Sequence, residues 1–88
     1  SRYEVCVDGE KVVFSPKEVE ILHLMAAHLN QVFTREQLLD SIWGFDFDGD
    51  SRVVDTSIKR IRKKLPEYSM LAVRSVYGVG YKIEAANA

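Results

Sequence analysis

The chain has 88 residues, of which 47% are hydrophobic and 28% charged, and from its composition and apolar runs we expect a folded chain with no membrane-spanning segment and no signal peptide. The formal net charge is −1, but residues 1–51 carry four Lys/Arg against ten Asp/Glu, whereas residues 52–88 carry eight against three. We therefore expect one domain, residues 1–88, with a basic face that can meet phosphates.

Two segments before residue 15 are predicted to be paired strands. Residues 3–7 and 11–14 are rich in Val, and the Asp8-Gly9 dipeptide between them suits a tight hairpin turn. Cys6 is the single cysteine, so neither an internal disulfide nor a zinc site can form from cysteines, and it is best interpreted as an apolar strand residue. One free cysteine fits a reducing compartment, and we expect a cytoplasmic protein.

The next segment predicts a helix with a well-defined start. Ser15 can cap it, Pro16 suits its first position, and Glu18 completes a capping box. Asn30 is expected to end it. Apolar residues form a wide stripe that places this helix in the core: Ile21, Leu22, Leu24, Met25 and Leu29.

A second helix is predicted after a short extended link at residues 31–33. Thr34 and Gln37 form another capping box, and Gly44 is expected to stop the helix. Its apolar face consists of Leu38, Leu39, Ile42 and Trp43. Residues 44–51 then form a loop that is rich in Asp and Gly.

A third helix and a hairpin complete the chain. Ser51 or Asp50 can cap the helix, which is expected to continue to Leu65 before Pro66. Residues 71–76 and 81–84 are predicted strands around a turn at residues 77–80, in which two glycines allow a tight bend. The order of strands, three helices and a C-terminal hairpin predicts an α+β winged helix-turn-helix.

The third helix divides into two faces when its residues are placed 100° apart. The core side consists of Val54, Ile58, Ile61 and Leu65. The opposite side consists of Arg52, Thr56, Lys59, Arg60 and Lys63. Solvated helix faces usually mix charge signs, whereas residues 52–65 hold six Lys/Arg against one Asp. Because an α-helix fits the major groove of duplex DNA, we interpret this helix as a DNA-reading element.

Six motifs in order closely resemble the C-terminal effector domain of the OmpR/PhoB family of bacterial response regulators. They are Ser15-Pro-Lys-Glu-Val-Glu-Ile-Leu22, Phe33-Thr-Arg-Glu-Gln-Leu-Leu39, Ile42-Trp-Gly44, Arg52-Val-Val-Asp55, Ile58-Lys-Arg-Ile-Arg-Lys-Lys-Leu65 and Tyr77-Gly-Val-Gly-Tyr81. The resemblance implies a winged helix that binds double-stranded DNA, usually direct repeats, as head-to-tail pairs. It also implies RNA polymerase as a partner and a histidine kinase acting through a receiver domain that this chain lacks.

The resemblance also implies roles for individual residues. The positions matching base contacts are Val53, Thr56, Lys59 and Arg60. The positions matching phosphate contacts are Arg35, Trp43, Arg52, Ser57, Arg62 and Lys63. Residues 44–51 match a loop that often touches RNA polymerase, with Phe45, Asp46, Phe47 and Asp48 as candidates. Arg35 also stands at a helix start, where a cation is mildly unfavourable and hints at a nearby phosphate.

The hairpin departs from the family pattern at one position. Its tip, Gly78 to Gly80, resembles the wing, and Arg74 and Lys82 are its nearest cations. Many relatives have Arg immediately before this Gly-Val-Gly segment, where it enters the minor groove, but here the residue is Tyr77. We expect Tyr77 to act by stacking or by a hydrogen bond to phosphate, and the wing to follow the backbone or the minor groove.

No enzyme, cofactor or metal site is expected from the remaining signals. Nucleophile, base and orienting residues do not occur together at a catalytic spacing, and no phosphate-binding loop of the Walker type is present. Residues 46–50 begin like a calcium loop but lack the required Gly and Glu further on. A second functional hypothesis is a protein-interaction module whose basic helix docks on an acidic partner.

Overall fold

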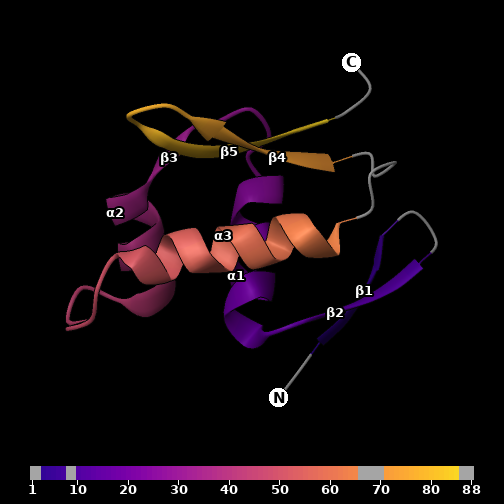
Figure 1. Cartoon of the computed structure of the whole chain (residues 1–88), viewed down its shortest axis with the longest axis horizontal. Coiled ribbons are helices and arrows are strands. Elements are labelled where there is room, and N and C mark those ends of the chain that lie inside the picture. The colour runs from indigo at the N-terminus through magenta and orange to yellow at the C-terminus, as the bar shows by residue number, and fades with distance from the viewer. Residues whose placement is uncertain (1–2, 8–9, 66–70, 86–88) are drawn as a thin grey trace.

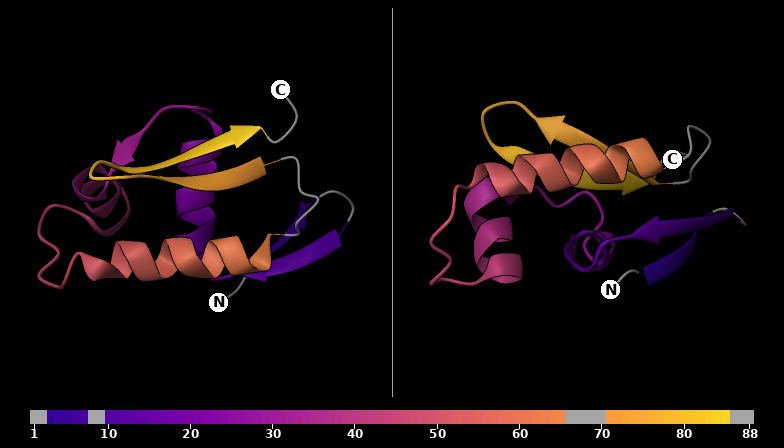
Figure 2. Two further views of the ribbon diagram at one scale, coloured as in Figure 1. Left: turned by 45° about the horizontal axis from the view of Figure 1, so that its top comes forward. Right: turned by 60° about the horizontal axis from the view of Figure 1, so that its bottom comes forward.

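The computed structural model describes residues 3–7, 10–65 and 71–85. In chain order its elements are β1 (Tyr3–Val7), β2 (Glu10–Phe14), α1 (Pro16–Ala26), β3 (Phe33–Thr34), α2 (Arg35–Leu38), the π-helical segment η1 (Leu39–Trp43), α3 (Arg52–Lys64), β4 (Leu71–Val76) and β5 (Gly80–Ala85). Helix α1 crosses behind α3, the β4–β5 hairpin lies along α3, and β1–β2 lies near the C-terminal end of α3 (Figures 1 and 2). This is the α+β arrangement that the sequence predicts.

The strands form two antiparallel sheets. β1 pairs with β2 as predicted, while the Asp8-Gly9 turn lies outside the described residues. In the second sheet β5 lies between β4 and β3, and the β3 partners are Phe33↔Tyr81 and Thr34↔Gly80. The prediction of a plain extended link at residues 31–33 was therefore incomplete, because the chain forms a short strand at its end that holds the C-terminal hairpin.

Helix α1 begins where the sequence predicts but ends earlier. Ser15 Oγ accepts a hydrogen bond from the Glu18 N–H at 3.3 Å, and Glu18 Oε1 accepts one from the Ser15 N–H at 2.9 Å, which confirms the capping box. The helix ends at Ala26 instead of near Asn30. The turn that follows brings Asn30 to φ 69°, where its N–H donates to the Ile83 carbonyl at 2.7 Å. Asn30, which was expected to end the helix, thus forms a hydrogen bond with β5 instead.

The second helix is interrupted by a change of winding. The Thr34–Gln37 capping box is confirmed, with bonds of 3.0 and 2.8 Å. After four residues of α-helix the chain continues as the π-helical segment η1, which ends as predicted at Gly44, with φ 102°. Lys17 of α1 donates to the Ile42 carbonyl at 2.8 Å, so a side chain from another helix satisfies one of the last carbonyls of η1.

The core lies where α1, η1, α3 and the sheet of β3, β5 and β4 meet. Its buried apolar residues are Phe14, Ile21, Met25, Phe33, Leu38, Ile42, Val54, Ile58, Ile61, Val73 and Ile83. Leu22, Leu24, Leu39, Trp43 and Leu65 pack against this core and are partly buried. Leu29 is 43% exposed, so its predicted place in the core stripe was wrong because α1 ends before it. In the described part of the chain, no helix has the length and hydropathy needed to cross a bilayer.

One charged residue is buried next to this core. The Glu18 side chain is 3% exposed and its Oε1 lies 2.6 Å from Nζ of Lys64, at the end of α3. Burial acts to raise the pKa of Glu18, but the hydrogen bonds from Lys64 and from the Ser15 N–H outweigh it, so the pKa is lowered from its usual value of 4.5. Glu18 therefore caps α1 and fixes the end of α3 with the same carboxylate.

We expect this carboxylate to make the stability of the domain depend on pH. A pKa that is lower in the folded chain stabilises the fold above the unfolded value near 4.5 and ceases to do so as pH falls through the folded value. Glu18→Gln should cost about 1–2 kcal/mol at neutral pH and flatten the acid loss of stability. Urea unfolding between pH 7 and pH 3 measures both effects. Glu20→Gln, on the exposed side of α1, is the control and should keep the acid slope.

Candidate nucleic-acid interface

Of the two residues that were expected to cap α3, Asp50 supplies the capping bond. Asp50 Oδ1 accepts from the Arg52 N–H at 2.9 Å, whereas the Ser51 side chain makes no capping bond to the helix. Arg52 also pairs with Asp50 through its guanidinium at 2.8 Å. These hydrogen bonds lower the pKa of the Asp50 carboxyl, which keeps the cap ionised. The exposed loop therefore supplies the negative charge that a helix start favours.

The two predicted faces of α3 are present. Val54, Ile58 and Ile61 are buried. The opposite side is exposed along its whole length and consists of Arg52, Thr56, Lys59, Arg60 and Lys63. Among the described residues, Lys59, Arg60 and Lys63 have no ion-pair or hydrogen-bond partner, so their charges are not neutralised within the fold. A helix with this unpaired cationic side is suited to a polyanion.

Between these faces, α3 has one flank that borders α1. A groove of about 510 Å³ runs along it. One wall of the groove comes from α1 and η1 with Ser15, Lys17 and Trp43, and the other from α3 and its cap. The α3 side contains Asp50, Arg52, Val53, Thr56, Ser57 and Arg60. Six residues predicted to contact DNA thus line one groove: Trp43, Arg52, Val53, Thr56, Ser57 and Arg60.

Trp43, which lines this groove, has two close neighbours. The Lys17 ammonium lies 5.7 Å from the centre of its ring, and the Phe47 ring centre lies 6.2 Å away. The indole is half-buried, so Trp43 packs against the core and still faces the groove. In this position Trp43 can pack in the apolar face of the second helix and also contact a phosphate, as the sequence predicts.

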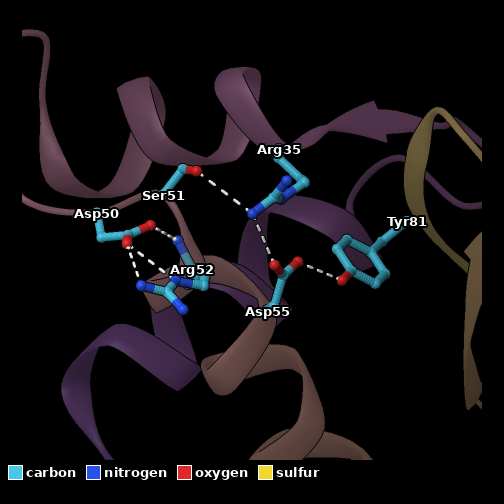
Figure 3. A network of polar contacts seen from close by, with 6 residues as sticks. All are labelled: Arg35, Asp50, Ser51, Arg52, Asp55 and Tyr81. Atoms are coloured by element: carbon cyan, nitrogen blue, oxygen red, sulfur yellow. Dashed lines mark hydrogen bonds and ion pairs between the residues drawn. The ribbon is translucent and has the colours of Figure 1, made fainter.

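The other flank of α3 faces the wing, which is the β4–β5 hairpin. Asp55 is the single acid on α3, and both of its carboxylate oxygens are used (Figure 3). Oδ2 lies 2.8 Å from Nη2 of Arg35, and Oδ1 accepts the Tyr81 hydroxyl at 2.5 Å. Arg35 Nη2 also donates to Ser51 Oγ at 3.3 Å. The starts of α2 and α3 are thereby tied to β5.

This network explains the cation at the start of α2 without a ligand. Asp55 neutralises Arg35, which the helix dipole alone would disfavour. The contacts use only Nη2, and since a guanidinium has five N–H donors, the others remain available. Burial, followed by the hydrogen bond to Asp55, raises the pKa of Tyr81 to about 12, so its hydroxyl remains a donor at neutral pH. Arg62 joins the same flank by donating to Ser75 Oγ at 3.2 Å.

The wing carries its cations away from its tip. Arg74 and Lys82 are opposite each other in the register, and both pair with Glu84, at 2.9 and 3.4 Å. Tyr77, at the tip, is fully exposed, and Gly78 next to it has φ 73°. A second groove of about 450 Å³ is lined by Arg35, Glu36 and wing residues 75–81. The wing therefore presents an aromatic ring and a glycine turn in place of a cation.

The loop between η1 and α3 carries an exposed aromatic residue. Phe45 is 90% exposed, whereas Phe47 packs on Trp43. Asp46 and Asp48 are exposed to solvent. Within residues 3–7, 10–65 and 71–85, no group of three or more His, Cys, Asp or Glu side chains is placed to hold a metal ion. The loop thus leaves the Phe45 ring open to solvent.

The structure adds residues that the sequence interpretation did not assign to the interface. Ser15 and Lys17 line the groove between α1 and α3 (the α1 groove), while Asp55 and Tyr81 connect α3 with the wing. Asp55 could have been singled out as the single acid on a basic helix. Lys17 gave no comparable signal, because only the packing of α1 against α3 brings it to the groove. Figure 1 shows α1 crossing behind α3.

Comparison with known sequences identifies a family and close relatives. Residues 9–83 match the model described as "Transcriptional regulatory protein, C terminal". The chain is 46% identical over 82 residues to the uncharacterized transcriptional regulatory protein YclJ of Bacillus subtilis. That alignment covers 92% of this chain and 36% of YclJ, so the chain spans little more than a third of the relative's length.

Solved structures with the same fold confirm the winged helix. The response regulator DrrB of Thermotoga maritima, an OmpR/PhoB homologue, superposes with a TM-score of 0.74 at 37% identity, covering 88% of this chain and 36% of DrrB. The RstA DNA-binding domain of Klebsiella pneumoniae, in complex with the RstA box, gives a TM-score of 0.76 at 32% identity. It covers 92% of this chain and 82% of that domain.

Proposed function

This chain belongs to the C-terminal effector domains of the OmpR/PhoB family of response regulators, which bind DNA to regulate transcription, and from that membership we propose how its surface engages a duplex. Helix α3 enters the major groove with its exposed cationic side toward the bases. The observation that carries the proposal is that α3 has an unpaired cationic side, with a groove toward α1 on one flank and the wing on the other. A helix lying in a major groove has one sugar-phosphate backbone on each side.

The flanks of α3 divide the proposed contacts between the two DNA strands. Base edges are assigned to Val53, Thr56, Lys59 and Arg60. The strand on the α1 side meets Trp43 and Ser57, and the strand on the wing side meets Arg35 and Arg62. Arg52 and Lys63 face outward and are also assigned to phosphates, with Arg52 lining the groove toward α1. Tyr77 stacks against the sugar edge or donates its hydroxyl to a phosphate, since the wing tip has no cation.

Arg60→Ala and Lys63→Ala separate base reading from phosphate binding. Arg60→Ala should cost about 1–3 kcal/mol on a preferred sequence and relax preference at one base pair. Lys63→Ala should weaken all sequences alike and lower the slope of log Kobs against log salt by about 1. Filter binding to a duplex selected from a random pool, and to the unselected pool, measures both. If Arg60→Ala behaved like Lys63→Ala, Arg60 would be a phosphate contact and its base-reading role would be wrong.

The protein-interaction hypothesis is tested with the same materials. Titration of random-sequence duplexes at low and at high salt should show binding that weakens steeply with salt, because neutralised phosphates release counterions. Failure to bind at low salt would favour an acidic protein partner for the basic helix. Selection from the random pool should also recover direct repeats, since the resemblance implies binding as head-to-tail pairs.

Further partners follow from family membership as proposals for the whole protein. Phe45, 90% exposed in the loop before α3, is proposed to contact RNA polymerase. Crosslinking from position 45 on promoter DNA tests this, with attachment at Lys11 as the negative control. We also propose that a histidine kinase regulates the whole protein through a receiver domain. The whole protein is proposed to be cytoplasmic.

A further inference from the structure

A cation on α1 faces the DNA-binding side of the molecule. Lys17 lies in the first turn of α1, outside the α2–α3 pair, and its side chain is 44% exposed. We propose that Lys17 binds a DNA backbone phosphate across the α1 groove, beside Trp43 and Ser57. This inference rests on the proposed function, because it extends that DNA interface onto a helix to which no DNA contact was assigned.

The groove holds the Lys17 ammonium in a defined place. Its Nζ donates to the Ile42 carbonyl at 2.8 Å and lies 5.7 Å from the centre of the Trp43 ring. An ammonium has three donors, so one bond to a carbonyl leaves two for a phosphate oxygen. Ser57 lines the opposite wall of the same groove. A phosphate between the walls would therefore meet donors from both sides.

The charges lining the groove favour an anion. Lys17, Arg52 and Arg60 stand against a single carboxylate, Asp50, which is paired with Arg52 at 2.8 Å. Lys17 has a second acidic neighbour, Glu20, but at 3.8 Å, and both side chains are about half exposed. An exposed pair of this kind contributes little. The positive charge of Lys17 thus remains available to a phosphate.

The path of a DNA strand is consistent with this position. Val53, Ser57 and Arg60 lie on the α1 flank of α3, and Lys17 faces them across the groove. When α3 occupies the major groove, the backbone on this flank runs past the groove between α1 and α3. Lys17 would then act on the strand opposite to the one that meets Arg35 and the wing.

A salt titration distinguishes this role from a purely structural one. The probe is a pool of random-sequence duplexes, bound by the unsubstituted chain, Lys17→Gln, Lys17→Arg and Lys11→Gln. Lys11 is exposed on β2 and does not line the groove, so it is the matched control. Lys17→Gln should lower the slope of log Kobs against log salt by about 0.9 and weaken binding about two- to fivefold at low salt. Lys17→Arg should restore both, and Lys11→Gln should change neither.

Two outcomes would count against the inference in different ways. If Lys17→Gln lowered the melting temperature but left the salt slope unchanged, Lys17 would only hold the end of η1, and the phosphate role would be wrong. If the unsubstituted chain failed to bind duplexes at low salt, the proposed function would fail and this inference with it. Binding by the unsubstituted chain, with a lower slope for Lys17→Gln alone, supports both.

Discussion

Replacing Gly80 with alanine should destabilise the domain by about 3 kcal/mol, because the added Cβ would collide with backbone. A Cβ built at Gly80 lies 1.9 Å from the Phe33 carbonyl oxygen and 2.9 Å from the Thr34 Cα, in the strand that pairs with β5. Since these are main-chain atoms, no side chain can rotate away. β3 would have to move, which would break its pairing with β5 and withdraw Phe33 from the core.

Gly78→Ala is the matched control for this substitution. A Cβ at Gly78 meets nothing within 4 Å, but its φ of 73° disfavours a side chain by about 1 kcal/mol. Urea unfolding should therefore rank Gly80→Ala well below Gly78→Ala in stability. Gly80→Ala should also weaken DNA binding, because the wing loses its pairing with β3. Equal stabilities for the two variants would show that the close approach of β3 is not required.

Ile58→Ala and Lys59→Ala should have opposite consequences although the residues are adjacent. Ile58 is buried against the core, and its truncation should cost about 2–5 kcal/mol of stability through lost contacts and the cavity that remains. Lys59 is exposed without a partner among the described residues, so Lys59→Ala should leave stability nearly unchanged and weaken duplex binding. Urea unfolding and filter binding measure the two effects.

To compare these two variants, the DNA affinity must be calculated for the folded fraction of each protein. Ile58→Ala should bind DNA with nearly normal affinity once its unfolded fraction is subtracted, because its side chain faces the core. A loss of stability in Lys59→Ala similar to that in Ile58→Ala would contradict the division of α3 into a core side and a DNA side.

The features that the sequence predicted well depend on neighbouring residues. Both capping boxes are formed by residues three positions apart, and the buried and exposed sides of α3 follow directly from helical periodicity. The resemblance to the OmpR/PhoB family was confirmed because its motifs run through nearly the whole chain. These signals are local, and the folded structure preserves them.

The features that the sequence did not reveal depend on distant partners. β3 has two residues and exists because it pairs with β5, far along the chain. Helix α1 ends at Ala26 and Asn30 bonds to the distant Ile83, although Leu29 prolongs the apolar pattern. Gly80, the second glycine of the wing, is needed for the close approach of β3 as well as for the turn. Lys17 reaches the groove only through the crossing of α1 and α3.

The position of Trp43 has a spectroscopic consequence. It is the single tryptophan of the chain, so the emission of the protein at long wavelength comes from one indole in one groove. A cation and an aromatic ring lie close to that indole, and solvent reaches it from the groove. A duplex entering the α1 side would replace that solvent and draw the ammonium of Lys17 toward phosphate. The domain therefore carries an intrinsic fluorophore that reports occupation of the α1 groove without a label.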